Sequence, residues 1–331
     1  MESLPNKYRP KCFAEVVGQS TIISILSRQI ESSSFRNSYL FCGPSGCGKT
    51  TVARIMANTL NNNEGEPIEI DAASNNGVDS IRALIVDAQQ TSIDSEYKVY
   101  IIDECHMLTN AAWNAALKLI EEPPTNSIFI FCTTNPDKIP ETILTRVQRF
   151  DFKRVPVKDI CDRLEYICNE ELSSKYEVNA LYRIAAMSNG YMRESVSLLE
   201  KCLGYSNDIT LDNVEKVLGC VKFDTLFDLL DNIVSKNEKR VLEIVEGLKA
   251  NNSDLLKVVD DLLGFLIECA KYQKTKDMNV VKLPSDYKDR LLYSDVDLVS
   301  FVERVLKFRT LSNAVNGSTL LDVISLDLCR R

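Results

Sequence analysis

The spacing of apolar residues along the 331-residue chain divides it into regions of different predicted structure. Up to residue 155, short apolar runs typical of buried strands alternate with segments whose apolar residues recur every three or four positions, as in helices. Predicted strands occupy 39–41, 67–70, 99–103, 128–133 and 149–152. Strands that alternate with helices predict an α/β fold, with a parallel sheet and helices on both of its faces.

After Pro156 the strand-like runs stop and the apolar spacing becomes helical. Residues 157–205 predict short helices, and a further region predicts helices near 223–234, 239–250, 255–272 and 297–316. The polar stretch 271–289 predicts a flexible loop. The pattern therefore predicts three domains: an α/β domain over 1–155, a small helical domain over 156–207 and an all-helical domain over 208–331.

Residues 43–50 spell Gly-Pro-Ser-Gly-Cys-Gly-Lys-Thr, which fits the phosphate-binding pattern G-x-x-x-x-G-K-[ST] between a predicted strand and a predicted helix. Glycines let the backbone curl until several N–H groups point inward, and the helix N-terminus adds partial positive charge. Lys49 is expected to reach the terminal phosphates and Thr50 to hold Mg²⁺. The nucleotide contacts predicted in this loop are Gly43, Gly46, Cys47, Gly48, Lys49, Thr50 and Thr51.

A second motif follows the apolar run 99–102, where Asp103 and Glu104 end the predicted strand. The carboxyl end of a parallel strand lies beside the phosphate loop, so Asp103 is expected to bind Mg²⁺ through water. Glu104 is expected to orient or activate the attacking water. His106, the only histidine, is predicted to have a local structural or coupling role, because phosphoryl transfer depends chiefly on positioning and charge.

Composition limits the class of protein. The chain is 45% hydrophobic and 26% charged, lacks a run of 18 apolar residues and lacks an apolar signal core at its start, which predicts a soluble intracellular protein with no membrane partner. The net charge of −8 argues against a protein that coats nucleic acid with its whole surface, so any nucleic-acid-binding site is expected to be a local basic patch. The eleven cysteines include no C-x-x-C pair, which predicts reduced thiols and no structural metal.

The letters Asp-Glu-Cys-His at 103–106 also occur in a class of nucleic-acid helicases. Those helicases carry two motor cores and an arginine-rich motif in the second core, whereas this chain has one phosphate loop and a predicted helical second half. A small kinase is another P-loop alternative, but it would not need the helical C-terminal third. Both alternatives stay open until further motifs are considered.

Several further segments, in their order along the chain, resemble the AAA+ clamp loaders. They spell Lys-Tyr-Arg-Pro at 7–10, Val-Val-Gly-Gln at 16–19, Glu-Ile-Asp-Ala-Ala-Ser at 69–74, Leu-Lys-Leu-Ile-Glu-Glu-Pro-Pro at 117–124 and Gly-Tyr-Met-Arg-Glu-Ser at 190–195. The sequence most resembles the gamma/tau family of the bacterial replicative clamp loader, over about residues 4–203. Beyond residue 210 the match depends only on length and helicity.

The resemblance implies roles for individual residues. Tyr8, Arg9, Pro10 and Val17 correspond to contacts on the adenine side, and Thr134 corresponds to the first sensor of the terminal phosphate. Arg146 resembles the arginine finger that reaches the nucleotide of a neighbouring subunit, and Arg193 resembles the second sensor, on a helical lid. Arginine suits both roles, because its fixed charge and planar fork match phosphate oxygens.

The resemblance also implies an architecture and an activity. The chain is expected to have an AAA+ domain, a helical lid and a helical collar, and to form a homo- or heteropentamer with other loader subunits. This assembly is expected to use ATP and Mg²⁺ to place a sliding clamp on primed DNA. The helix start with Ser74, Asn75 and Arg82 is expected to meet DNA phosphates, although Ser74 or Asn75 as a simple helix cap is an equal alternative. The segment 90–93 and Tyr97 faintly resemble a clamp-binding peptide, with an exposed polar loop as the plainer interpretation. Such a protein would work in the cytoplasm, near the nucleoid.

Two departures from the family pattern stand out. Residues 60–67 replace a four-cysteine zinc module, and the finger motif is Thr145-Arg146-Val147 where the family usually has Ser-Arg-Cys. These differences predict a divergent or viral member, which would act in the host cytoplasm if viral. Some loader subunits are structural partners without ATPase activity, but Lys49, Thr50, Asp103 and Glu104 are all present here and favour an ATPase.

Overall fold

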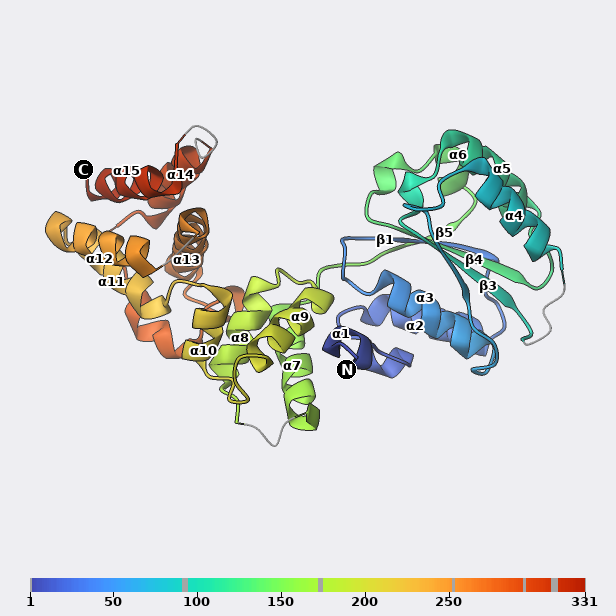
Figure 1. Ribbon diagram of the computed structural model, residues 1–331, viewed down its shortest axis with the longest axis horizontal. Helices are drawn as coiled ribbons and strands as arrows, with labels where there is room; N and C mark the ends of the chain where they lie inside the picture. The colour runs from blue at the N-terminus through green and yellow to red at the C-terminus, as the bar shows by residue number, and fades with distance from the viewer. Residues whose placement is uncertain are drawn as a thin grey trace. The chain divides into compact units, whose positions relative to one another are not determined.

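The computed structural model describes residues 2–90, 95–171, 175–251, 254–293, 296–310 and 315–330. The chain divides into two compact units (Figure 1). The first unit comprises Met1–Glu170 and Met187–Glu200, and the second comprises Glu171–Ala186 and Lys201–Arg331. The predicted domain boundaries at 155 and 207 remain a prediction.

The first unit contains a five-stranded parallel sheet with the order β2-β3-β4-β1-β5. Its strands are β1 (Ser38–Cys42), β2 (Ile68–Asp71), β3 (Lys98–Asp103), β4 (Ser127–Thr133) and β5 (Gln148–Asp151). Each lies within two residues of a predicted strand, so the predicted α/β fold with a parallel sheet is confirmed. Because β1 lies between β4 and β5, while the chain continues to the distant edge strand β2, the end of β1 opens at a crossover point where such sheets bind ligands.

Both faces of the three central strands, β3, β4 and β1, are buried, which explains why these strands are almost continuously apolar, whereas the edge strands β2 and β5 are partly exposed and carry polar residues. Tyr39, Phe41 and Ile101 point to one face, where they pack with α2 (Ser20–Glu31) and α3 (Lys49–Leu60). Leu40, Tyr100 and Phe129 point to the other face, which is covered by α4 (Val78–Ala88), α5 (Asn110–Glu121) and α6 (Glu141–Leu144). Figure 1 shows these two helical layers on opposite sides of the strands.

Further helical segments complete the first unit. They are α1 (Leu4–Lys7), η1 (Phe13–Glu15), η2 (Cys105–Met107), η3 (Pro136–Lys138), α7 (Val157–Glu171) and most of α9 (Met192–Leu203). The backbone N–H of Leu4 donates to Glu200 Oε1 at 2.9 Å, and that of Val155 donates to the carbonyl of Gly190 at 3.0 Å. The first bond joins α1 to the last turn of α9, and the second joins the segment before α9 to the chain just after β5.

The described residues of the second unit form an all-helical structure, as predicted for the C-terminal part of the chain. Its elements are α8 (Val178–Met187), α10 (Leu211–Leu218), α11 (Phe223–Val234), α12 (Glu238–Asn251), α13 (Leu255–Thr275), η4 (Met278–Val280), η5 (Ser285–Leu291), α14 (Leu298–Arg309) and α15 (Gly317–Cys329). One apolar core unites the elements from α11 onward, with Phe227, Leu266 and Leu321 fully buried. None of the helices in the described part of the chain is both long and apolar enough to span a membrane.

Two local predictions in this unit are wrong. The stretch 271–289 is not a simple loop, because α13 continues to Thr275 and Val281 and Leu283 are buried in the core between two short 3₁₀ helices. The predicted helix over 297–316 ends at Arg309, and the next helix starts after Asn316, whose side chain accepts from the backbone N–H of Thr319 at 2.8 Å. Asparagine is a strong helix N-cap, and this cap was overlooked in the sequence.

Candidate nucleotide-binding site

The phosphate loop lies between β1 and α3, at the carboxyl edge of the sheet. The backbone N–H of Gly43 donates to the carbonyl of Thr133 at 3.1 Å, which fastens the loop to β4. Gly48 is the N-cap of α3 and has a φ of 104°, a backbone conformation that residues other than glycine rarely adopt. This backbone aims the start of α3, with its free N–H groups, at the space above the loop.

Alanine at Gly43 and at Gly48 should have different effects. A Cβ on Gly43 would lie 2.6 Å from the carbonyl oxygen of Phe152, so Gly43→Ala should lower the free energy of unfolding by about 3 kcal/mol. A Cβ on Gly48 meets no atom within 4 Å, so Gly48→Ala should cost only about 1 kcal/mol and project its methyl group into the open site. Urea unfolding measures the loss of stability in both variants, and ATP titration measures whether the methyl group of Gly48→Ala weakens ATP binding. Equal losses of stability would contradict this account.

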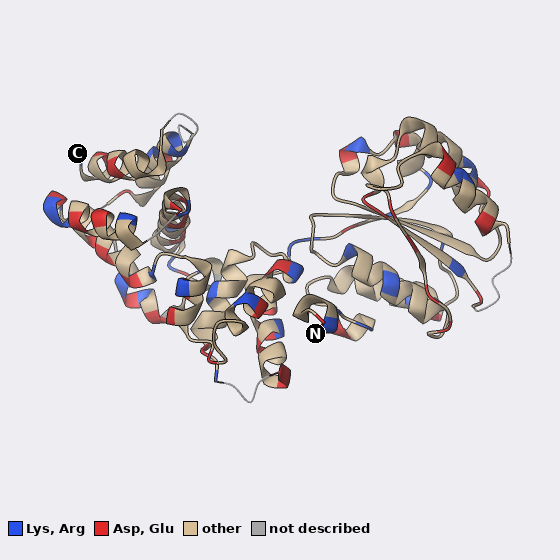
Figure 2. Cartoon of the chain, viewed as in Figure 1, with Lys and Arg blue, Asp and Glu red and all other residues tan. Residues whose placement is uncertain are grey.

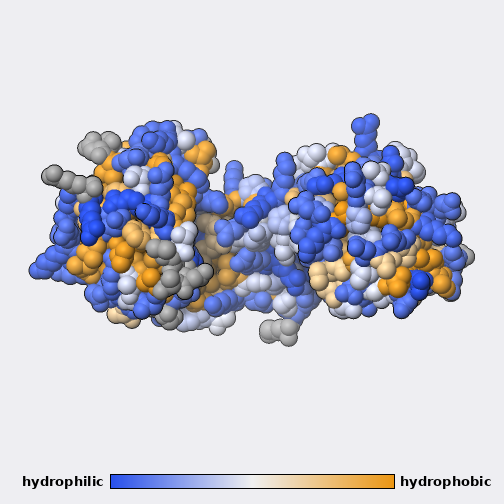
Figure 3. Space-filling model, turned by 90° about the horizontal axis from the view of Figure 1, so that it is seen from above, coloured by the Kyte–Doolittle hydropathy of each residue, from blue (hydrophilic) through white to orange (hydrophobic). Residues whose placement is uncertain are grey.

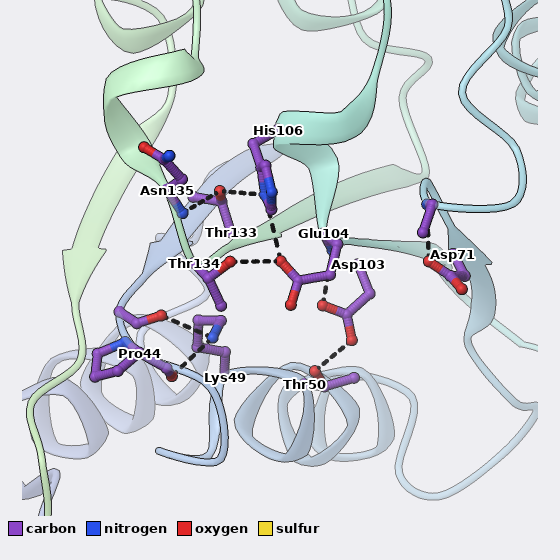
Figure 4. A network of polar contacts seen from close by, with 12 residues as sticks. Pro44, Lys49, Thr50, Asp71, Asp103, Glu104, His106, Thr133, Thr134 and Asn135 are labelled. Carbon is purple, nitrogen blue, oxygen red and sulfur yellow. Dashed lines mark hydrogen bonds and ion pairs between the residues drawn. The ribbon is translucent and has the colours of Figure 1, made fainter. Parts of the chain in front are cut away.

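Lys49 and Thr50 begin α3 and face the loop (Figure 4). Lys49 is 6% exposed, and its Nζ donates to the carbonyls of Gly43 at 2.8 Å and Pro44 at 3.0 Å. Among the described residues, no carboxylate forms an ion pair with Lys49. Its charge is therefore balanced only by backbone dipoles and remains available to an anion.

Thr50 and Asp103 fit a magnesium ion. The hydroxyl of Thr50 donates to Asp103 Oδ2 at 2.7 Å, while Asp103 Oδ1 accepts from the backbone N–H of Glu104 at 2.9 Å. Mg²⁺ prefers oxygen ligands and is generally held by one or two protein groups together with substrate phosphates and water. No group of three or more His, Cys, Asp or Glu side chains that could hold a metal ion occurs in the part of the chain that the structure describes.

Glu104 lies at the centre of a polar network at the ends of β3 and β4 (Figure 4). Its Oε2 accepts from the hydroxyl of Thr134 at 2.8 Å and lies 3.3 Å from His106 Nδ1. His106 Nδ1 is also 3.2 Å from the hydroxyl oxygen of Thr133, which accepts from the backbone N–H of Asn135 at 3.0 Å. The left-handed backbone of Glu104, with a φ of 46°, turns its carboxylate toward these groups.

A pocket opens above the loop and is lined entirely by the first unit. Predicted site residues that line it are Tyr8, Arg9, Pro10, Val17, Gly46, Cys47, Gly48, Lys49, Thr50, Thr51, Asp103, Glu104 and Arg193. Its apolar wall adds Pro5, Val16, Val155, Met192 and Val196. A polar floor with an apolar upper wall suits a nucleoside triphosphate, because phosphates need N–H donors and a base needs apolar contact.

Arg163 also lines the pocket, although the sequence analysis missed it. Its Nη2 donates to the carbonyl of Tyr8 at 2.9 Å, and its guanidinium lies 4.8 Å from the ring centroid of Tyr166. It thereby ties α7 to the N-terminal segment that forms the upper wall. No sequence motif marks Arg163, since its role depends on a contact between residues 155 positions apart.

The pocket carries an excess of basic side chains, with Arg9, Lys49, Arg163 and Arg193 facing Asp103 and Glu104. Burial, together with the charges of Arg54 and Arg193, lowers the pKa of Arg9. Such clustering of cations favours a polyanionic ligand.

Two cysteines flank the phosphate loop. Burial raises the pKa of the Cys42 thiol to about 11 and also raises the pKa of Cys47, so both stay protonated near pH 7. They therefore serve as apolar packing groups around the loop.

Comparison with known proteins decides the family. Residues 209–295 match a family model described as DNA polymerase III subunits gamma and tau domain III, and residues 68–156 match one described as DNA polymerase III, delta subunit. The DNA polymerase III subunit tau of Bacillus subtilis is 34% identical over 98% of this chain. The chain belongs to the AAA+ clamp-loader family. The family resemblance noted from the sequence is thus confirmed.

Other relatives set the extent of the match. The DNA polymerase III subunit tau of Escherichia coli is 33% identical over 82% of this clamp-loader chain. The chain spans about half the length of the relatives it matches, 58% for the Bacillus protein and 45% for the Escherichia protein. A solved structure of the Thermotoga maritima RuvB Holliday junction branch migration motor has a TM-score of 0.55 and 21% identity, over 68% of this chain and 79% of that chain. At this identity the likeness shows the AAA+ fold alone.

Three residues predicted for the nucleotide site do not line the pocket: Gly43 from the phosphate-loop pattern, and Thr134 and Arg146 from the clamp-loader resemblance. Gly43 lies beneath Lys49, and Thr134 contacts Glu104. Arg146 is exposed after α6, where its Nε lies 2.8 Å from Glu121 Oε1. Its place outside its own pocket is compatible with action on another subunit.

The residues predicted to contact DNA or the clamp form contacts within this chain, and their binding of DNA or of the clamp stays a prediction. Ser74 and Asn75 both bond to Asp71, and α4 starts only at Val78 with Gly77 as its N-cap, so the alternative that Ser74 or Asn75 caps this helix is wrong. Arg82 is exposed and pairs with Asp79 at 3.2 Å. Residues 91–93 of the predicted clamp peptide lie outside the described residues, and Tyr97 packs edge-on against Phe35.

Proposed function

We propose that this chain is an ATP-hydrolysing clamp-loader subunit, which uses ATP to open a sliding clamp and place it on primed DNA. The observation that carries this proposal is the continuous set of contacts from Thr50 through Asp103 and Glu104 to Thr134. These contacts connect the phosphate loop with the end of β4, where Thr134 would sense the terminal phosphate. Family membership supplies the process that this site serves.

Each polar group has a role in hydrolysis that its position supports. Lys49 and the N–H groups of the loop would bind and orient the triphosphate, and Thr50 and Asp103 would hold Mg²⁺, which would offset negative charge on the phosphates. Glu104 lies where it can orient a water for attack, and Thr134 holds that carboxylate through a 2.8 Å hydrogen bond. Tyr8, Arg9, Pro10 and Val17 contact the nucleoside end, and Arg193 on α9 contacts the phosphates from above.

Assembly completes the site in this proposal. Arg146 is outside its own pocket and exposed, so it serves the nucleotide of a neighbouring subunit as an arginine finger. The second unit supplies a surface for the collar, since large apolar side chains such as Val299, Leu306 and Leu326 stay exposed. Apolar surface on this unit is visible in Figure 3. The expected assembly is a homo- or heteropentamer with other loader subunits.

DNA would be held by local groups rather than by a basic surface. Figure 2 shows lysine and arginine interspersed with aspartate and glutamate over the helices. The exposed turn with Ser74 and Asn75 leads into α4, whose start has no side-chain cap, and Arg82 lies one turn further. Free N–H groups and one cation can contact the backbone phosphates of primed DNA without reading its bases.

Glu104→Gln should uncouple binding from hydrolysis. The amide keeps an oxygen that can accept from Thr134, so ATP binding should stay within about two-fold, whereas the rate of hydrolysis should fall about 100-fold with loss of the carboxylate. Equilibrium ATP binding and single-turnover hydrolysis measure the two quantities. A variant that hydrolyses ATP at the original rate would remove Glu104 from the proposed mechanism.

The proposed function is tested by steady-state ATP hydrolysis of the purified assembly, alone, with primed DNA, with a sliding clamp, and with both. A clamp-loader subunit should hydrolyse ATP fastest when both are present and should leave the clamp on DNA. A helicase would instead separate DNA strands without any clamp, and that result would overturn the proposal. Native mass measurement of the same sample gives the number of subunits.

A further inference from the structure

The guanidinium of Arg146 is held by its own subunit at two of its three nitrogens, Nε and Nη1. Its Nε lies 2.8 Å from Glu121 Oε1. Its Nη1 donates to the carbonyl of Thr142 at 2.7 Å and to the hydroxyl of Thr145 at 3.3 Å. Within the described ranges, Nη2 has no partner, and the side chain is 40% exposed. The group is therefore held at Nε and Nη1, and Nη2 remains available to a further acceptor.

The two residues of this ion pair are anchored in a common core. Glu121 is the last residue of α5 and directly follows Ile120, and Arg146 comes two residues after the end of α6, three after Ile143. Ile120 and Ile143 are both buried in the apolar cluster on one face of the sheet. The backbones that carry the carboxylate and the guanidinium are thus held in fixed positions relative to each other.

Stability does not explain a carboxylate at this position. Glu121 lies at the C-terminus of α5, where the partial negative charge of the helix end disfavours anions. The pair with Arg146 is about half exposed on both sides, with side-chain exposures of 40% and 48%, and such pairs contribute little to folding. What the contact does is restrict the orientations of one arginine.

We infer that Glu121 is a positioning residue for the arginine finger: it holds the guanidinium of Arg146 by Nε so that Nη2 points outward to the phosphates of a neighbouring subunit's ATP. This inference rests on the proposed function, because it requires that Arg146 acts on a neighbour. A pre-oriented donor loses less freedom when the transition state forms, which favours the rate of hydrolysis over the binding of ATP.

Glu121→Ala should therefore lower kcat for ATP in the confirmed assembly about five-fold and leave KM unchanged, since a half-exposed pair restrains the side chain only modestly. Glu121→Asp retains the carboxylate and should restore part of the rate, whereas Glu121→Gln, which loses the charge of the ion pair, should not. Glu122→Ala is the matched control, because this adjacent exposed carboxylate has no ion pair in the described part of the chain. Native mass measurement verifies that each variant assembles.

The double variant Glu121→Ala/Arg146→Ala separates this inference from the proposed function. If Glu121 acts through Arg146, the double variant should hydrolyse ATP at the rate of Arg146→Ala alone. A normal or faster rate for Glu121→Ala, while Arg146→Ala is slow, would overturn the positioning role and leave the finger intact. A normal rate for Arg146→Ala itself would overturn the finger, and with it the reason for Glu121.

Discussion

Lys49→Ala is expected to remove ATP binding and hydrolysis together, by at least about 100-fold in each. The ammonium is nearly buried, and its only contacts in the described structure are two backbone carbonyls of the loop. A buried cation without a carboxylate partner is costly for folding, so its charge is explained by an anionic ligand. Isothermal titration with ATP and Mg²⁺, followed by a steady-state assay, measures both losses.

Folding stability provides the control for this variant. Because removal of an uncompensated buried charge relieves a desolvation cost, Lys49→Ala should unfold at the same temperature as the original protein or above it. Lys138→Ala, which removes an exposed lysine from η3, should leave ATP binding and hydrolysis unchanged. ATP binding of normal affinity by a folded Lys49→Ala protein would show that the pocket is not the nucleotide site.

The fold of the first unit was largely predictable because its central strands β1, β3 and β4 are short apolar runs buried on both faces, and because the phosphate-loop letters place β1 before α3. The second unit was less predictable in detail. Val281 and Leu283 lie in a polar stretch of sequence, so only the surrounding helices show that they are buried. The break between α14 and α15 depends on a cap at Asn316, a local bond that apolar spacing cannot indicate.

Some residues of the site could be predicted from local motifs, whereas others reach it only through tertiary contacts. Lys49, Thr50, Asp103 and Glu104 are found by motif letters, because the chemistry requires those residue types at the ends of β1 and β3. Arg163 has no such mark, since it reaches the pocket from α7. The pairing of Glu121 with Arg146 likewise joins residues from two helical segments, and no spacing rule connects them.

Arg146→Ala is expected to leave ATP binding by each subunit unchanged and to slow hydrolysis in the assembled complex by roughly 10³-fold. The side chain is exposed and lies outside the pocket of its own subunit, so its loss removes no contact to the nucleotide bound there. A guanidinium supplied by the neighbour stabilises charge that develops only in the transition state, and this is why the rate and not the affinity should change.

The measurement compares single-turnover hydrolysis with equilibrium ATP binding, at a protein concentration where native mass measurement shows the assembly intact. Arg149→Ala is the matched control, since Arg149 is also exposed, lies three residues away and pairs only with nearby Asp151 in the described structure. It should hydrolyse ATP normally. Mixed assemblies of two variants give the decisive result. Arg146→Ala subunits retain a working nucleotide pocket, and Lys49→Ala subunits retain Arg146. Where a Lys49→Ala subunit is the neighbour of an Arg146→Ala subunit, it should restore hydrolysis in the pocket of that Arg146→Ala subunit. Mixed assemblies as slow as Arg146→Ala alone would mean that Arg146 does not act across a subunit interface.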